Sequence, residues 1–185
     1  GPGYWNASPG ALLIYLEHLH GRTGGTVSIY DEAKLRRMAE FVANAHLADR
    51  WALNFADAGA RMGVKRCAAY RFGERIGSEP LKALVRFSMR EWTAKQPVSP
   101  LIQRHLSGGD LDFMLRELFW MPGDEPAGVM VKNRTVWYPE TQVLVARESE
   151  NAMQGFILGA KGGHNAENHN HNDIGQFIIL RNGVP

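Results

Sequence analysis

The sequence predicts a multidomain α+β protein in which helices come first and antiparallel strands follow. Apolar residues recur at helical spacing up to about residue 120. Residues 122–126, Pro-Gly-Asp-Glu-Pro, then indicate a linker. Beyond the linker come short runs rich in Val, Ile, Thr and aromatic residues, which favour strands. We therefore expect two domains, a helical one over 1–121 and a strand-based one over 122–185.

The helices are predicted from their apolar stripes and their boundary residues. Ser8 would be the N-cap of the first helix, with Pro9 at its first helical position, and the glycine-containing stretch at 21–25 would end it. The next helix is expected from Asp31, with an apolar face that continues to Ala45. Further helical patterns lie around 64–76, 80–93 and 111–120, separated by breaks that contain Gly or Pro.

Strands are expected in the second part, because β-branched and aromatic residues cluster there in short runs between turn residues. Asn182-Gly183, after the last run, is a hairpin-turn signal. The expected strands are 135–138, 142–147, 155–160 and 176–181.

The composition narrows the classes of function. Of the 185 residues, 44% are hydrophobic, which is enough to bury a core. Lys and Arg number 21 against 19 Asp and Glu, so the chain lacks the strongly basic balance of a nucleic-acid-binding protein. No apolar run approaches the roughly 18 residues that cross a bilayer, and the single Cys67 rules out an internal disulfide. The chain starts without an initiator Met, and we expect it to be a piece of a longer protein.

The most informative stretch is the run at 161–175, Lys-Gly-Gly-His-Asn-Ala-Glu-Asn-His-Asn-His-Asn-Asp-Ile-Gly. In an extended backbone alternate side chains share a face, so His169, His171 and Asp173 would point the same way. Zinc takes imidazole nitrogens and carboxylate oxygens as ligands. The interleaved Asn168 and Asn170 offer amide groups to the hydroxyls and carboxylates of a substrate. A loop of surface histidines is the alternative, but so close a cluster favours a metal or an anionic substrate.

A turn that presents two aromatic rings is the second candidate feature, Gly1-Pro2-Gly3-Tyr4-Trp5. A phenol, with an ordinary pKa of about 10, suits a group that must hold and return a proton, so Tyr4 could be a general acid or base. Trp5 could stack on a sugar ring. A hydrophobic plug at a helix N-terminus explains the same residues equally well, and the spacing leaves both interpretations open.

Three motifs together resemble the heparinase II/III-like polysaccharide lyases. They are Gly1-Pro2-Gly3-Tyr4-Trp5, Phe55-Ala56-Asp57-Ala58 and the histidine run continued to Phe177. Their order and spacing match over nearly the whole chain, and the glycine-rich histidine run is the most specific part. The resemblance implies an incomplete α/α toroid followed by an antiparallel β-sandwich. This chain would then hold the last toroid helices and the first sandwich strands.

The resemblance also implies a function. Lyases of this family cleave acidic, uronate-containing polysaccharides by β-elimination, in which a base removes the C5 proton and an acid protonates the leaving glycosidic oxygen. Tyr4 matches the family's acid, which often serves as the base too, and His169 matches an active-site histidine on the sandwich side. Members are usually exported from bacterial cells, which implies a periplasmic or secreted protein.

A structural zinc on the sandwich side is implied as well. His171 matches one zinc ligand, and the other ligands would follow Pro185. Asp173 does not match the family's zinc aspartate, and we expect it to bond the backbone or to orient an imidazole. The segment that neutralises the substrate carboxylate would precede Gly1. We therefore expect this fragment alone to bind zinc weakly and to be inactive.

Two other functions remain open. The pattern His169-x-His171-x-Asp173 has the spacing of a metal motif that could activate a water in a hydrolase. Ile174 counts against it, because a metallo-β-lactamase-like protein would carry another His there. The third possibility is a non-catalytic glycan-binding protein that kept the scaffold.

Overall fold

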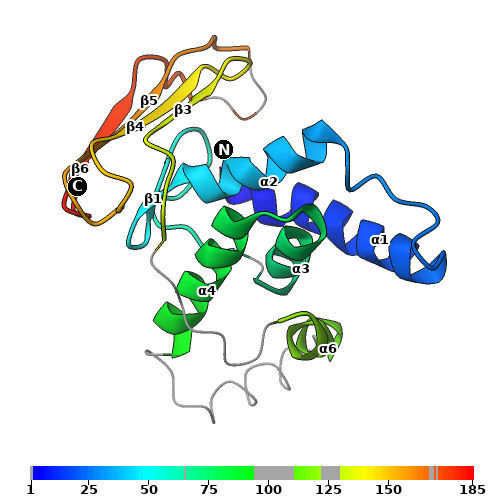
Figure 1. The fold of residues 1–185 in the computed structure, drawn as a ribbon. Coiled ribbons are helices and arrows are strands. Elements are labelled where there is room, and N and C mark those ends of the chain that lie inside the picture. Colours follow the sequence, from blue (N-terminus) through cyan, green and yellow to red (C-terminus); the bar gives the residue numbers. More distant parts are fainter. Residues whose placement is uncertain (1, 65, 94–110, 122–129, 167–168, 170) are drawn as a thin grey trace. The chain divides into compact units, whose positions relative to one another are not determined.

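The computed structural model describes residues 2–64, 66–93, 111–121, 130–166, 169 and 171–185 (Figure 1). The chain forms two compact units. The sheet unit comprises Gly1–Trp5, Glu40–Gly63 and Val129–Pro185, and the helical unit comprises Asn6–Ala39 and Val64–Gly128. The mixture of helices and antiparallel strands confirms the α+β class that the sequence predicts.

The helices lie within two residues of their predicted positions. They are α1 (Ser8–Arg22), α2 (Ala33–Ala45), α3 (Arg66–Ile76), α4 (Glu79–Thr93) and α6 (Leu111–Trp120). The prediction of Ser8 as N-cap was wrong by one residue, because the first intrahelical bond runs from the Ala11 N–H to the Ala7 carbonyl. None of the helices in the described part of the chain combines the length and hydrophobicity that a membrane span requires.

Small residues let α3 and α4 approach closely within the helical unit. A side chain at Gly73 would come within 2.7 Å of the Lys82 side chain and 3.3 Å of the Ser78 carbonyl. Cys67, on the same helix, is 1% exposed. It therefore packs as a small hydrophobe.

The sheet unit is built on a four-stranded antiparallel sheet of order β3-β4-β5-β6 (Figure 1). The strands, all of them predicted, are β3 (Thr135–Tyr138), β4 (Val143–Arg147), β5 (Phe156–Lys161) and β6 (Phe177–Arg181). After β6, Asn182 and Gly183 both have positive φ, and Arg181 pairs with Val184. The predicted hairpin turn is therefore present.

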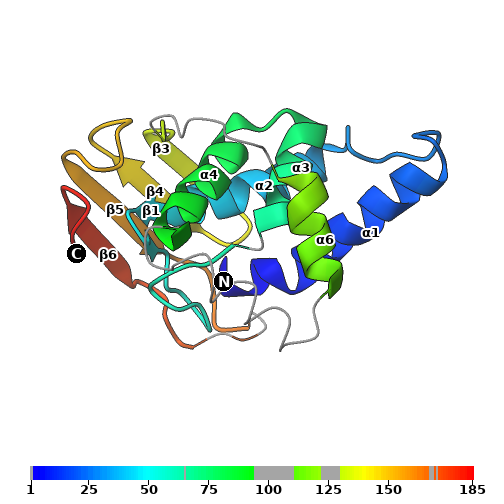
Figure 2. The ribbon, with the colours of Figure 1, turned by 90° about the horizontal axis from the view of Figure 1, so that it is seen from below.

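The inner face of this sheet packs against Glu40–Gly63, which holds the end of α2 and the short strands β1 (His46–Ala48) and β2 (Trp51–Ala52). Figure 2 shows β1 beside the sheet. Gly159 on β5 allows this contact, because a side chain there would lie 2.5 Å from Leu53. The buried core is formed by Ala45, Leu47, Ala48, Leu53, Phe55, Val143, Val145, Ala152, Ile157 and Leu180. A segment that precedes the expected boundary at 121 thus packs with the strands.

Two buried basic side chains occupy the C-terminal end of α2. The Lys132 ammonium donates to the Ala43 carbonyl at 2.6 Å, and the Arg147 guanidinium donates to the carbonyls of Asn44 and His46, each at 3.2 Å. The last carbonyls of a helix lack intrahelical partners and favour positive charge. The two side chains therefore cap α2 from the sheet side.

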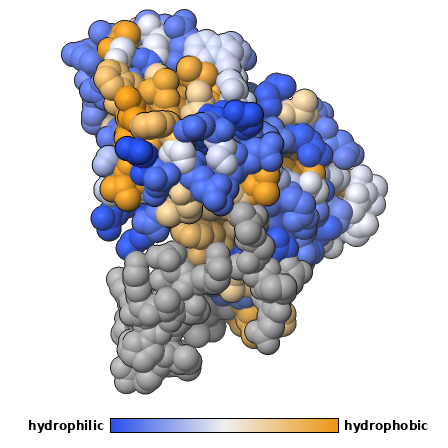
Figure 3. Space-filling view, turned by 60° about the vertical axis from the view of Figure 1, so that its left-hand side comes forward, coloured by the Kyte–Doolittle hydropathy of each residue, from blue (hydrophilic) through white to orange (hydrophobic). Residues whose placement is uncertain are grey.

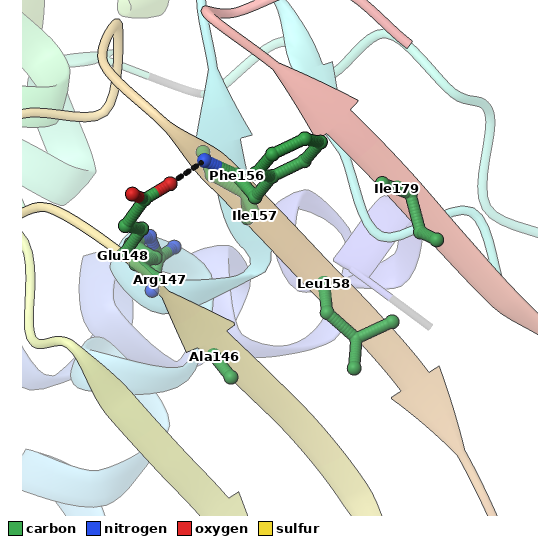
Figure 4. Close-up of a pocket in the computed structure, with 7 residues that line it drawn as sticks. All are labelled: Ala146, Arg147, Glu148, Phe156, Ile157, Leu158 and Ile179. Atoms are coloured by element: carbon green, nitrogen blue, oxygen red, sulfur yellow. Dashed lines mark hydrogen bonds between the residues drawn. The ribbon is translucent and has the colours of Figure 1, made fainter.

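The outer face of the sheet is apolar and exposed. Trp137, Phe156, Phe177 and Ile179 are each about half exposed or more, and Figure 3 shows hydrophobic side chains gathered on this face. A shallow hollow of about 370 Å³ lies here, and Figure 4 shows the residues that line it. It is lined by Ala146, Arg147, Glu148, Phe156, Ile157, Leu158 and Ile179. Apolar residues on both faces are typical of a sheet buried between two layers.

Candidate functional site

Tyr4, Asp57, His169 and His171 meet within the sheet unit, although they come from three separate stretches of the chain. The Tyr4 hydroxyl donates a 3.1 Å hydrogen bond to Asp57 Oδ2 and lies 3.3 Å from His169 Nδ1. His169 Nδ1 lies 2.8 Å from the same carboxylate oxygen, and His171 Nε2 bonds the other one, Oδ1. The structure thus brings together three of the residues that the sequence singles out as site residues.

Tyr4 lies on the short 3-10 helix η1 (Pro2–Asn6), in which Pro2 is buried. The preceding Gly3 lies against the loop of Asp57, since a Cβ on Gly3 would be 3.5 Å from Ala58 Cα and 3.7 Å from the Asp57 carbonyl oxygen. The Tyr4 ring packs on the His169 ring with a centroid separation of 4.7 Å. Tyr4 remains 43% exposed, so its hydroxyl side can meet a ligand.

Asp57 is the functional candidate that sequence reasoning missed. The sequence around Asp57 predicted only a break between helices. The one feature that could have indicated a role for Asp57 was its place in the motif Phe55-Ala56-Asp57-Ala58. The structure places it in the loop after β2, directly after Ala56, which has a left-handed φ of 53°. The Asp173 carboxylate accepts the Ala56 N–H at 2.6 Å. This bond joins the loop of Asp57 to the loop between β5 and β6 that contains His169 and His171, which we call the histidine loop.

The histidine loop connects β5 to β6, and hydrogen bonds hold both of its ends in place. Gln142 binds one end, because its carbonyl accepts the Gly162 N–H at 2.7 Å and its side chain accepts the Gly163 N–H at 3.0 Å. At the other end, the Gly175 N–H bonds the Lys161 carbonyl at 2.8 Å. A compact loop of this kind can hold side chains at its tip without a regular strand.

The expectation that His169, His171 and Asp173 lie on an extended segment was wrong. His169 and Asn172 have positive φ, 58° and 55°, which breaks the alternation of a strand. Both imidazoles contact Asp57, whereas Asp173 is 2% exposed and bonds the Ala56 backbone. The separate expectation that Asp173 bonds the backbone is confirmed.

The other site residues predicted from the sequence lie elsewhere or outside the described part. Trp5 is 3% exposed, which supports the packing interpretation of this ring over stacking on a sugar. Asn168 and Asn170, expected to bind substrate, lie outside the described residues. His164 is exposed, and its Nδ1 accepts the N–H of Ala166 two residues on, so it caps a local turn.

Asp57 also sets the charge state of the cluster. The hydrogen bond to Asp57 is the main cause that raises the pKa of Tyr4, so the phenol keeps its proton at neutral pH. Hydrogen bonds from Tyr4 and then from His171 lower the pKa of Asp57, so the carboxylate stays ionised. A protonated phenol, a carboxylate and two imidazoles in one hydrogen-bonded group can donate and accept protons.

Zinc is not accommodated by these residues alone. In the described part of the chain, no group of three or more His, Cys, Asp or Glu side chains is arranged to hold a metal ion. His171 Nε2 bonds Asp57, and the Asp173 carboxylate faces the Ala56 N–H. To ligate an ion through Nε2, His171 would have to give up its contact with Asp57.

Known protein families and curated proteins offer no match to this chain. A functional proposal therefore depends on the residues around Asp57 and on the family resemblance of the sequence motifs.

Proposed function

We propose that this chain is part of a polysaccharide lyase that cleaves an acidic, uronate-containing glycan by β-elimination. The observation that supports it most is the 3.3 Å approach of the Tyr4 hydroxyl to His169 Nδ1. These two residues match the catalytic tyrosine and histidine of the heparinase II/III-like lyases, and they are 165 positions apart. A chance likeness between two short motifs gives no reason for their side chains to meet.

β-Elimination needs a proton acceptor at C5 of the uronate and a proton donor at the leaving oxygen. Tyr4 is protonated at neutral pH, because a phenol has an ordinary pKa of about 10 and the bond to Asp57 raises it further, so Tyr4 has a proton to donate. The His169 side chain is 49% exposed beside it and suits the acceptor role or assistance to Tyr4. Asn168 and Asn170 are proposed to bind the sugar. By the resemblance, the groups that neutralise the substrate carboxylate precede Gly1.

The proposal extends to the architecture, an incomplete α/α toroid followed by a β-sandwich. In a β-sandwich each sheet packs one face against the other sheet, and here the inner face already packs on Glu40–Gly63, so a second sheet would cover the outer face. The outer face with Trp137, Phe177 and Ile179 exposed supports this, because such a face is suited to pack against a second sheet. Successive antiparallel strands in the order β3-β4-β5-β6 also suit one layer of a sandwich.

Zinc and export belong to the proposal by resemblance. His171 would contribute one ligand of a structural zinc, completed by residues that follow Pro185. No step of the reaction is assigned to the ion, because the described residues do not form its site. A periplasmic or secreted location would give such an enzyme access to polysaccharide.

The test uses a longer protein that includes the flanking segments. Alginate, heparin, heparan and chondroitin are offered in turn, and the absorbance of the unsaturated uronate product is followed. Tyr4→Phe is expected to lower kcat by about 10²–10⁴-fold, because it removes the transferable proton. Tyr15→Phe is the matched control, since Tyr15 is an exposed tyrosine of the helical unit. No product from any substrate, together with no effect of Tyr4→Phe, would refute the proposal.

The same assay separates the two alternatives. A metal-dependent hydrolase would cleave without forming a C=C bond and would stop on chelation. Its proposed third ligand, Asp173, accepts the Ala56 N–H, and the described residues hold no group of three or more His, Cys, Asp or Glu side chains arranged for a metal ion, so the geometry favours the lyase. A glycan-binding protein would retain the polysaccharide without turnover.

A further inference from the structure

An arginine without a carboxylate partner lies at the end of the loop that carries Asp57. The guanidinium of Arg61 stacks over the ring of Trp51, with 4.9 Å between its Cζ and the ring centroid. Among the described residues, no Asp or Glu forms an ion pair with Arg61. In the helical unit, by contrast, Arg71 bonds Glu17. The charge of Arg61 is therefore available to a ligand.

The backbone places Arg61 directly opposite Trp51. The two residues form an antiparallel bridge, and next to it the Ala52 N–H donates to the Ala60 carbonyl at 2.9 Å. Side chains of directly opposite residues in an antiparallel pair are neighbours on one face. The ring of Trp51 packs against the buried core of the sheet unit. The guanidinium of Arg61 therefore lies on a ring that is itself held in place.

Stacking leaves the hydrogen-bonding edges of the guanidinium accessible. The group is planar, so an aromatic ring covers one of its faces and none of its N–H groups, which point outward in the plane. Two of these N–H groups along one edge match the two oxygens of a carboxylate, which they bind through parallel hydrogen bonds. Arg61 is exposed, so a ligand can reach these edges. The stacked arginine is therefore suited to bind a carboxylate in a defined orientation.

The loop between Trp51 and Arg61 connects this arginine to the candidate site. Asp57, within the loop, accepts the hydrogen bond from the Tyr4 hydroxyl at 3.1 Å. Four residues of chain lead from Asp57 to Arg61, so their Cα atoms lie at most about 14 Å apart. A polysaccharide with one sugar at Tyr4 extends over several further sugars. A neighbouring unit of the same chain can therefore reach Arg61.

We propose that Arg61, stacked on Trp51, binds the carboxylate of a uronate unit that neighbours the unit being cleaved. That the ligand is a glycan rests on the proposed lyase function, whereas the recognition of a carboxylate follows from the guanidinium and its accessible edges. The unit bound by Arg61 does not react. Arg61 therefore contributes to the affinity for substrate and not to the chemical step.

The first experiment measures binding and needs no turnover. The 185-residue chain is labelled with ¹⁵N, and oligosaccharides of alginate, heparin, heparan and chondroitin are added in turn. Trp51→Phe identifies the indole N–H signal of Trp51. At least one of these glycans is expected to shift that signal saturably, and esterification of its carboxylates is expected to abolish the shift. Arg61→Gln is expected to weaken the binding about 10-fold, because it removes the charge and the paired donors.

Two further variants separate a defined site from general attraction between charges. Arg61→Lys keeps the charge but loses the planar pair of donors, so it is expected to recover only part of the affinity. Arg134→Gln removes another exposed arginine of the sheet unit and is expected to bind as wild type. A wild-type Trp51 signal that none of the four glycans moves overturns the site, even if the variants fail to fold. A shift that survives esterification, full affinity in folded Arg61→Gln or Arg61→Lys, or an equal loss in Arg134→Gln overturns it as well.

The second experiment tests the consequence for turnover in the longer protein. Arg61→Gln is expected to raise KM about 10-fold with little change in kcat, because it removes binding that substrate and transition state share. Tyr4→Phe is expected to lower kcat instead, so the two variants should differ in kind. An active lyase in which Arg61→Gln leaves KM unchanged overturns this inference alone. Wild-type protein that binds a glycan through Arg61 but forms no unsaturated product overturns the proposed function and leaves the carboxylate site in place.

Discussion

The Asp173 carboxylate accepts a 2.6 Å hydrogen bond from the backbone N–H of Ala56, 117 positions earlier in the chain. Asp173 is 2% exposed, so this contact is shielded from water. It joins the loop that carries Asp57 to the loop that carries His169 and His171. The arrangement of the candidate site therefore depends on a residue that does not itself contact the phenol of Tyr4.

Asp173→Ala is expected to destabilise the chain by about 1–3 kcal/mol, because it leaves the Ala56 N–H without this acceptor. Asp173→Asn is the control, since its amide oxygen can still accept that hydrogen bond. Urea unfolding measures the stability, and hydrogen exchange at the Ala56 amide measures the contact. Fast exchange in Asp173→Ala with slow exchange in Asp173→Asn is the expected pattern. Equal protection in the two variants would contradict the assigned contact.

Local sequence patterns predicted the helices and the longer strands, but not the contacts between segments that are distant in sequence. The strand at 142–147 was predicted because β-branched residues between turns favour a strand wherever it lies. The strands β1 and β2 were not predicted, since segments of three and two residues are too short to show a periodicity. Their pairing with the sheet core depends on contacts distant in sequence.

The candidate site was predicted in part for the same reason. Tyr4, His169 and His171 are chemically conspicuous residues in recognisable motifs. Asp57 is an ordinary aspartate next to an alanine, and its role arises from a left-handed Ala56 that no propensity of alanine indicates. The alternation assumed for the histidine run failed because positive φ at His169 and Asn172 turns the chain.

The helical unit contains a buried carboxylate whose charge is needed for stability. Glu17 is 8% exposed and bonds Arg71, Arg75 and the Tyr30 hydroxyl. Burial alone would raise the pKa of Glu17, but hydrogen bonds from Arg75 and Arg71 outweigh it and lower the pKa from 4.5 to about 2. The stabilisation is therefore present above pH 4.5 and is lost as the pH falls towards 2.

Glu17→Gln is expected to lower the free energy of unfolding by about 3 kcal/mol at neutral pH. The variant should also lose less stability than wild type between pH 5 and 2. Circular dichroism of the helical signal during urea unfolding at several pH values measures both effects. The exposed Glu32→Gln is the control and should behave as wild type. A Glu17→Gln curve parallel to wild type in this range would show that Glu17 does not titrate as described.

Substitutions on the two faces of β6 are expected to change the stability of this chain by very different amounts. Leu180 is fully buried on the inner face, so Leu180→Ala should cost about 2–5 kcal/mol in the 185-residue chain. Phe177 is 67% exposed, so Phe177→Ser should change the stability of this chain by less than about 0.5 kcal/mol. In a longer chain that carries the second sheet of the proposed sandwich, Phe177→Ser should cost about 2 kcal/mol or more. Equal, small effects in both chains would argue against a second sheet on this face.

Lys132 should make the sheet unit more stable as the pH rises through the alkaline range. Burial, and then the charge of Arg147, lower the pKa of Lys132 from 10.5 to about 7. Between these values the unfolded chain binds the proton and the folded chain does not, so the free energy of unfolding rises with pH. Burial likewise lowers the pKa of His46 from 6.5 to about 3, which gives a separate rise at acidic pH.

Lys132→Met keeps the bulk of the side chain and removes the titration, so the rise between pH 7 and 10, on the order of 2 kcal/mol, should disappear. The rise between pH 3 and 6.5, to which His46 and Glu17 both contribute, should persist and serves as an internal control. Lys34→Met, at an exposed position of α2, should leave both rises unchanged. Tryptophan fluorescence during urea unfolding across this pH range measures them. If the alkaline rise survives in Lys132→Met, the ammonium that caps α2 keeps its proton in the fold, and its bond to the Ala43 carbonyl then outweighs the cost of its burial.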